Sequence, residues 1–324
     1  MSEATGRSGG GGASQPEPVL NLLHRGYKSV VTDSTSLTSH KRQYNGDCEL
    51  VKLNWKQFFN IAKAKLHDVT RGVTIPAEEA MLMRMAAAGA EAAQVGKIIP
   101  VRTEAELNAR YGFVVGTGVA DVVNACMKQK QPTWKEVSFH VQGSPCEGSG
   151  RPDFLIKQTG AGGVHGEVDV CGGEGEMPSV VYQPILHLTD MQGGVGDMLM
   201  QACSYCQEKG WRFTFVTTHL LTFIIWRVAE DKYAVTNGIL YDADPYDLFA
   251  REALAYIIWM SLEAPWCTKL PAGQLQELEA KLKGQAAVAV LHGRPKERQG
   301  QGRTGKRSAS TWWALVQARK RLLS

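Results

Sequence analysis

The chain has 324 residues, of which 44% are hydrophobic, and its formal net charge is +4. This length exceeds a typical domain of about 100–200 residues, so the sequence fits either one large domain with extensions or two domains. No stretch of about 18 or more apolar residues occurs, so we expect no membrane-spanning helix. The seven cysteines lack the spacing of a disulfide framework, which predicts reduced thiols in an intracellular protein, nuclear or cytoplasmic.

The first part of the chain predicts a leader followed by a mainly helical region. Residues 1–18 are rich in Gly and Ser without an apolar run, which indicates a disordered leader rather than a secretory signal. Residues 19–130 contain short β-prone runs and then helical patterns, the first from Asn54 to Leu66. Thr103-Glu-Ala-Glu106 is a capping-box pattern, so a further helix should begin there. We expect the Gly-rich residues 112–118 to interrupt that helix.

Residues 131–264 predict an α/β core. Alternating or strongly apolar runs predict strands at Glu136–Val141, Arg212–Thr218 and Leu221–Arg227, the last two joined as a hairpin. Helices are expected from Asp197 to Lys209 and from Asp247 to Glu263, the second apolar almost all round and therefore buried. This order predicts an α/β fold in which a mixed central sheet is flanked by helices, with a mainly helical N-terminal extension.

Acidic residues interrupt the apolar strands of this core. With the two-residue period of a strand, Asp153, Leu155 and Lys157 share one face of the run Arg151–Lys157, while Phe154 and Ile156 point the other way. Glu167 and Asp169 share one face of the next run. If these strands pair, the three carboxylates form a cluster that would be costly to bury without neutralisation. Oxygen ligands of this kind suit Mg²⁺, so Asp153, Glu167 and Asp169 are candidate metal ligands. Gln201 and Tyr205, four residues apart, should share a face of the following helix.

Beyond the core we expect a helix within residues 265–291 and a basic tail at residues 292–324. The tail contains nine Arg or Lys residues and one Glu, so its charge of +8 leaves −4 for the residues before it. A flexible polycation attracts phosphate backbones through counterion release, whereas a solvated tail without a ligand is the more common fate of such a run. Nucleic acid is therefore one candidate partner, and a protein is another.

At the acidic residues the chain resembles the PD-(D/E)xK nuclease superfamily, over about residues 103–264. Pro152-Asp153 matches the first half-motif, and Glu167-Val168-Asp169 matches the second except that Asp169 stands where the family has lysine. Gln201 and Tyr205 match a helix signature of several branches. The resemblance implies a restriction-endonuclease-like fold and an Mg²⁺ site at Asp153, Glu167 and Asp169. It also implies that Lys157, as a displaced lysine, aligns the attacking water, and that Gln201 and Tyr205 complete the site.

Several alternatives stay open at this point. A competing frame places the second half-motif in the strand 180–190, with His187 and Thr189 at the acid and lysine positions, which would keep the fold without the chemistry. Glu167 and Asp169 could also be solvated in a Gly-flanked loop. The function is then that of a nuclease-like protein with a degenerate site that binds nucleic acid or a protein, or that of an active Mg²⁺-dependent phosphodiesterase. A third reading makes Cys203 and Cys206, with Cys171 and His165, a metal or redox site.

Overall fold

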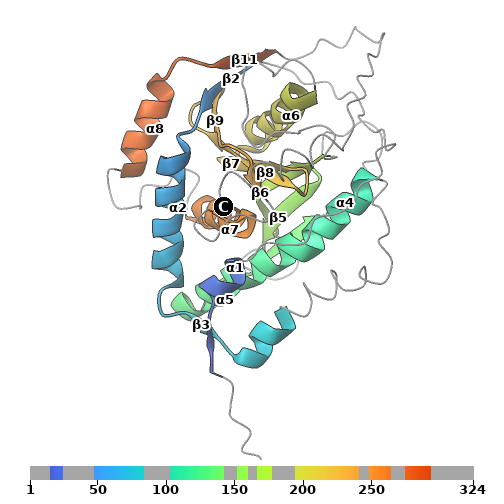
Figure 1. Ribbon diagram of the computed structural model, residues 1–324, viewed down its shortest axis with the longest axis vertical. Helices are drawn as coiled ribbons and strands as arrows, with labels where there is room; N and C mark the ends of the chain where they lie inside the picture. The colour runs from blue at the N-terminus through green and yellow to red at the C-terminus, as the bar shows by residue number, and fades with distance from the viewer. Residues whose placement is uncertain are drawn as a thin grey trace, which may run out of the picture.

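A mixed sheet lies at the centre of the computed structural model (Figure 1). The structure describes residues 15–24, 47–83, 103–141, 152–159, 166–176, 194–240, 248–263 and 274–292. Within these ranges the sheet has nine strands, and the pairs β2–β9 and β6–β7 are parallel while the others are antiparallel. In spatial order the strands are β11 (Ala289–His292), β2 (Asp47–Lys52), β9 (Lys232–Val235), β8 (Leu221–Arg227), β7 (Phe213–Thr217), β6 (Val168–Gly175), β5 (Phe154–Gln158) and β4 (Val137–Val141), and β10 (Ile239–Leu240) pairs with β8.

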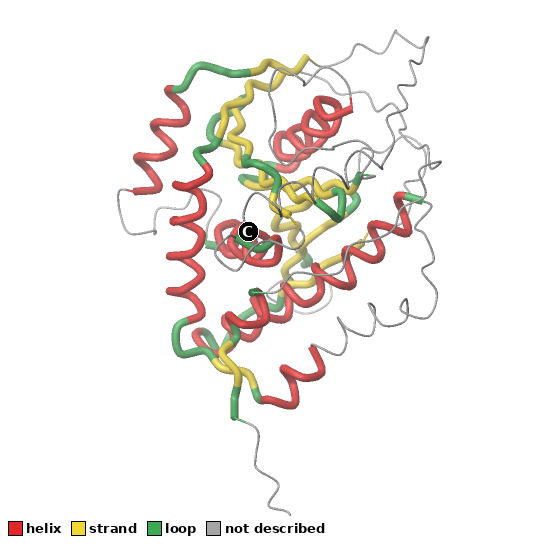
Figure 2. Tube along the Cα trace, viewed as in Figure 1, coloured by secondary structure: helices red, strands yellow, loops and turns green. Residues whose placement is uncertain are grey.

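Helices cover both faces of this sheet (Figure 2). One face packs against α6 (Gly194–Lys209) and holds the smaller of two apolar clusters. The larger cluster fills the other face and includes residues of the remaining long helices. These are α2 (Trp55–Thr70), α4 (Glu104–Tyr111), α5 (Gly118–Lys130), α7 (Ala250–Leu262) and α8 (Gln274–Gly284). Near the start of the chain lie the short helix α1 (Leu20–Leu23) and strand β1 (Glu17–Pro18), which forms a separate two-stranded sheet with β3 (Thr74–Ile75).

The prediction of an α/β fold with a mixed sheet flanked by helices is confirmed. The alternation expected for β5 is also observed, because Phe154 and Ile156 belong to the larger cluster and Leu155 belongs to the α6 cluster. Strands β2 and β11 extend this same sheet, although the sequence analysis grouped them with regions outside the core. No helix in the described ranges combines the length and apolarity that a membrane span needs.

The expected interruption at residues 112–118 was wrong. The chain is helical without a break from Glu104 to Lys130, and a six-residue π-helix, η1 (Gly112–Thr117), joins α4 to α5. The glycines serve close packing against β4 instead. A Cβ atom on Gly112 would lie 2.1 Å from a methyl carbon of Val141, and one on Gly116 would lie 2.3 Å from the ring of Phe139. The glycine signal therefore marks a helix that approaches the sheet closely.

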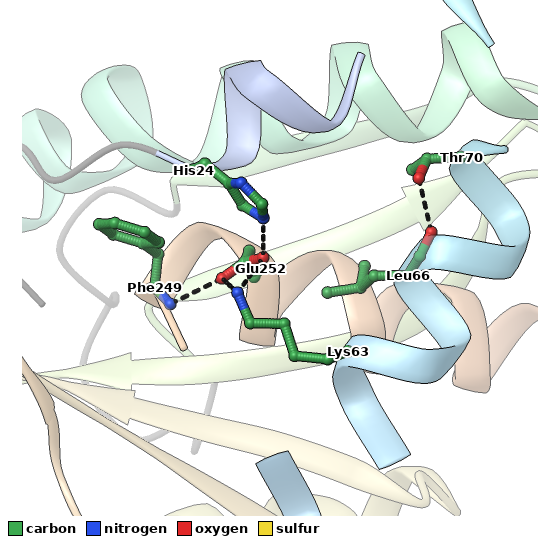
Figure 3. A network of polar contacts seen from close by, with 6 residues as sticks. All are labelled: His24, Lys63, Leu66, Thr70, Phe249 and Glu252. Atoms are coloured by element: carbon green, nitrogen blue, oxygen red, sulfur yellow. Dashed lines mark hydrogen bonds and ion pairs between the residues drawn. The ribbon is translucent and has the colours of Figure 1, made fainter. Parts of the chain in front are cut away.

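A buried carboxylate joins the N-terminal elements to the core (Figure 3). Glu252 of α7 is fully buried, and both of its oxygens lie 2.7 Å from Nζ of Lys63 in α2. The same carboxylate pairs with the ring of His24 and accepts a 2.9 Å hydrogen bond from the backbone N–H of Phe249. Glu252 thus connects segment 15–24, α2 and the first turn of α7.

Replacing Glu252 with Gln should lower the free energy of unfolding by about 2–3 kcal/mol, because Lys63 and His24 lose their charged partner. Their partial exposure keeps the loss below that of a pair buried on both sides. The matched control is Glu136→Gln, whose ion pair with Lys128 is more than half exposed and should contribute at most about 1 kcal/mol. Denaturant unfolding measures both, and equal losses would contradict a central role for Glu252.

Gly116→Ala should destabilise the protein by about 1–3 kcal/mol, because its methyl group would overlap the ring of Phe139. Gly118 provides an internal control two residues away, since nothing lies within 4 Å of a Cβ atom placed there. Gly118→Ala should therefore raise stability, by up to about 1 kcal/mol, through helix propensity. Opposite signs in thermal unfolding support the close packing of η1 on β4. A gain in stability for Gly116→Ala would refute it.

Candidate acidic site

Asp153 lies at the start of β5 and faces the end of β6. Its side chain is buried, with 7% of the residue exposed, and Oδ2 accepts a 3.0 Å hydrogen bond from the backbone N–H of Gly175. The antiparallel register pairs Phe154 with Gly173, and Asp153 and Glu174 are the residues that adjoin this pair at the end of the sheet. Residues that face each other across neighbouring strands have Cβ atoms about 4.5–5.5 Å apart. Two acidic residues of adjacent strands therefore meet at this end of the sheet.

Glu174 connects this pair of strands to α6. It is buried, and its Oε1 accepts a short hydrogen bond from Nε2 of Gln201. The same nitrogen donates to the hydroxyl oxygen of Tyr205 at 2.9 Å, which confirms that Gln201 and Tyr205 share a face of the helix. All three side chains are at least nine-tenths buried. Gln201 thus connects Tyr205 to Glu174, an acid that is absent from the residues predicted from the sequence, and Asp153 lies at the same end of β6 through its bond with Gly175.

The glycines around Glu174 explain why it was missed. A side chain on Gly172 would overlap the ring of Trp211, and one on Gly173 would overlap the ring of Phe215. A Cβ atom on Gly175 would lie 1.7 Å from Oδ1 of Asn108 in α4. These glycines are required by neighbours that press onto β6 from both faces. In sequence, however, Gly172-Gly-Glu-Gly-Glu176 has the composition of a loop.

The predicted convergence of Asp153 with Glu167 and Asp169 is not observed. Asp169 pairs across the strands with Lys157, four residues from Asp153, a separation of about 13 Å at the rise of a strand. Glu167 precedes β6, and its half-exposed carboxylate lies 2.8 Å from Nζ of Lys157. Asp169 also lies 3.7 Å from Nζ of Lys209. The side chains at the end of β5 and the start of β6, here called the outer end, therefore form a surface group of ion pairs.

The electrostatics of that outer group agree with ordinary ion pairing. The hydrogen bond from Lys157 lowers the pKa of Glu167, and the same bond raises the pKa of Lys157. Both groups are thus held in their charged forms by each other. Lys157 forms this exposed ion pair and lies away from the buried carboxylates of Asp153 and Glu174. The competing residues His187 and Thr189 lie outside the described residues.

Glu176 lies two residues after Glu174, so its identity matters if Glu174 is the second acid of the motif. At this position the resembled family has its lysine, and the backbone N–H of Glu176 donates to the carbonyl of Thr217 at 2.8 Å. The site thus offers carboxylates, an amide and a phenol. Over the ranges that the structure describes, no three His, Cys, Asp or Glu side chains are grouped so as to hold a metal ion. Mg²⁺ needs only one or two carboxylates, since waters and substrate phosphates complete its shell.

A second polar network lies under the same end of the sheet, on the face that α4 covers. The hydroxyls of Tyr111 and Thr222 are 3.1 Å apart, and Thr222 is 3.1 Å from the hydroxyl of Thr217, the register partner of Gly175. His219 follows in the β7–β8 turn with a φ of +65°. Burial lowers the pKa of His219 to about 3, so its ring is neutral. In sequence, His219 lies between two predicted strands, a position typical of a hairpin connection.

Among the described residues, the cysteines that were predicted as a metal or redox site do not form a metal-binding group. Cys203 and Cys206 lie inside α6 and are fully buried in its cluster, whereas Cys171 belongs to the cluster on the other face of the sheet. His165 lies outside the described residues. Burial raises the pKa of Cys206 and also raises that of Cys171, the latter to about 12, so both are neutral thiols.

Comparisons with protein-family models, with curated proteins and with solved structures find no match to this chain. Assignment of a function consequently depends on the geometry of the acidic site and on its chemistry.

Replacing Gln201 with Leu should lower the free energy of unfolding by about 1.5–3 kcal/mol, because the buried carboxylate of Glu174 loses a hydrogen-bond donor. Tyr205→Phe removes a neutral acceptor of Gln201 and should cost about 1 kcal/mol. Denaturant titration of the two variants at neutral pH gives the comparison. If Gln201→Leu proves no more damaging than Tyr205→Phe, the contact with Glu174 contributes little to stability.

Proposed function

We propose that this chain is a nuclease-like protein whose acidic site, formed by Asp153 and Glu174, binds Mg²⁺ and through it the phosphates of nucleic acid. The observation that carries the proposal is that Asp153, which immediately precedes β5, and Glu174 of β6 both adjoin the paired residues Phe154 and Gly173, and that Asp153 accepts a hydrogen bond from the backbone N–H of Gly175. The contact of Glu174 with Gln201, and of Gln201 with Tyr205, adds the helix residues of the resembled family. The second half-motif is then Glu174-Gly175-Glu176.

The physical case for a cation is the cost of two neighbouring carboxylates in a buried place. Burial disfavours the charged form of each acid, and a like charge nearby disfavours it further. One hydrogen bond from the backbone N–H of Gly175 reaches Asp153, and one from Gln201 reaches Glu174. A bound Mg²⁺ would offset the repulsion and would present open positions to phosphate oxygens. Asp153 and Glu174 would hold the ion, and Gln201 would fix the orientation of Glu174.

The absence of a lysine at position 176 favours a binding protein over a nuclease. In the resembled family that lysine positions or activates the attacking water, and here the residue is Glu176. Lys157, the displaced candidate, is engaged with Glu167 at the other end of the strands. The alternative is an active phosphodiesterase in which Glu176, on the same face as Glu174 by the strand period, supplies a further carboxylate for metal.

Calorimetric titration with Mg²⁺ tests the site directly. Asp153→Asn and Glu174→Gln should each weaken Mg²⁺ binding by about tenfold or more, because each removes a charged ligand. Glu167→Gln is the matched control: it removes the same charge from the exposed ion pair and should leave the affinity unchanged. Circular dichroism would verify that each variant is folded. A wild-type protein that binds no Mg²⁺, or an effect of Glu167→Gln equal to that of Glu174→Gln, would contradict the proposal.

Cleavage assays on single- and double-stranded DNA and RNA with Mg²⁺ separate the two functions. For the binding protein we expect binding without cleavage by the wild type, and cleavage to emerge in Glu176→Lys, which places the missing cation two residues after Glu174. Robust cleavage by the wild type that is lost in Glu174→Gln would instead establish the phosphodiesterase.

A further inference from the structure

A serine and a histidine meet on the edge strand β4. Their side chains share one face by the two-residue period of a strand, and Oγ of Ser138 lies 2.7 Å from Nε2 of His140. Residues two apart along a strand are separated by about 6–7 Å, so the imidazole must extend along β4 to reach the hydroxyl. A hydroxyl within hydrogen-bond reach of a histidine nitrogen is the arrangement that activates a serine nucleophile. We propose that Ser138 and His140 form a catalytic dyad that hydrolyses small carboxylic esters, at a site separate from the acidic one.

The dyad lies on an accessible part of a well-supported strand. Ser138 and His140 are both only partly buried, and within the described ranges β4 is the last strand on its side of the sheet. On the opposite face of β4, Val137 and Phe139 pack into the larger apolar cluster. The packed face holds the strand in place, and the partial exposure of the other face leaves room for a small substrate to approach Ser138.

A cation on the neighbouring strand suits the transition state of ester cleavage. The register pairs Lys157 of β5 with Ser138, and Cβ atoms of directly opposed residues lie about 4.5–5.5 Å apart. The ammonium of Lys157 has three N–H groups, one of which donates to Glu167 at 2.8 Å. A cation placed here favours the oxyanion that forms when a serine attacks an ester carbonyl. Its partial exposure makes this contribution smaller than that of an enclosed oxyanion hole.

Glu167 favours the charged state that His140 adopts during the reaction. The hydrogen bond and the charge of Lys157 lower the pKa of Glu167, and the charge of His140 lowers it further. The interaction is mutual, so the carboxylate stabilises the imidazolium that forms when His140 accepts a proton. The nucleophile thus has a cation as its cross-strand neighbour, and the base interacts with an anion.

The reaction balances with one ester and one water. With its own proton on Nδ1, His140 accepts the hydroxyl proton of Ser138 at Nε2 while Oγ attacks the carbonyl carbon, and the C=O electron pair moves to the oxygen. The oxyanion then collapses, the bond to the leaving oxygen breaks, and His140 returns the proton to that oxygen as an alcohol departs. Water attacks the acyl group on Ser138 in the same way, which releases a carboxylic acid and restores the serine.

A fluorophosphonate probe tests the dyad on the full-length protein. Oγ attacks the phosphorus, fluoride leaves, and peptide mass spectrometry should locate the phosphonyl group on Ser138. Ser138→Ala should abolish this labelling, and His140→Ala should slow it by about 100-fold or more, because the base is lost. His67→Asn is the matched control: it removes an exposed imidazole at the end of α2 and should leave the rate unchanged.

Two further measurements separate catalysis from a structural role. Added imidazole should restore labelling in His140→Ala, because a free base replaces the missing ring, whereas it cannot repair a misfolded strand. Lys157→Met should slow labelling by about tenfold through loss of the cation. Hydrolysis of p-nitrophenyl acetate should rank the variants in the same order, and circular dichroism would verify that each is folded.

Labelling of other serines while Ser138 stays unmodified, or a rate for folded His140→Ala equal to that of the wild type, would overturn the proposal. The assays contain EDTA, so their result does not depend on a metal ion. Failure of Mg²⁺ to bind would therefore refute the acidic site alone, and absence of labelling would refute the dyad alone.

Discussion

The close approach of neighbouring side chains to the end of β6 is the constraint on which the acidic site depends. Trp211, Phe215 and Asn108 occupy the space that side chains at positions 172, 173 and 175 would need. Because the strand is reduced to backbone at these positions, it can be enclosed from both faces and still pair with β5 and β7. Glu174 is the one residue with a side chain in Gly172–Gly175, and the enclosure buries it.

Enclosure makes the ionised form of Glu174 depend on the partners that the fold supplies. A buried carboxylate without hydrogen bonds costs several kcal/mol, so its neighbours decide whether it stays charged. Gln201 gives one hydrogen bond to Glu174 and directs its other N–H to Tyr205, which fixes the orientation of the amide. Asp153 is held separately by the backbone of Gly175. Because Gly175 is the neighbour of Glu174 in β6, the same end of this strand positions both acids.

Much of the fold could be predicted from sequence because burial leaves a periodic pattern. The alternation in β5, the apolar hairpin of β7 and β8 and the apolar helix α7 each indicated their structure correctly. At two places, however, glycines that are typical of a loop or of a helix end lie inside regular secondary structure. At Gly116 and at Gly172–Gly175 glycine marks a tight contact between distant segments, which composition cannot distinguish from a loop. Gln201 and Tyr205 were selected through the resemblance to a helix signature, and the helix does keep both on one face, whereas the choice between Glu167 and Glu174 depended on where β6 begins and ends.

The charge of the site decides what it can bind. Asp153, Glu174 and Glu176 carry a formal charge of −3 when ionised, so one Mg²⁺ leaves −1, whereas a lysine at position 176 would leave +1. A net negative site repels a phosphate, and in a partly buried place the repulsion is only weakly screened. Phosphate binding therefore requires either a second divalent ion, as in two-metal sites, or basic residues from elsewhere in the chain. The +8 charge of residues 292–324 is the largest such reserve in the sequence. Its counterion release would give affinity without base recognition, so in the proposed function the tail and the acidic site would supply complementary parts of one interaction with a phosphate backbone.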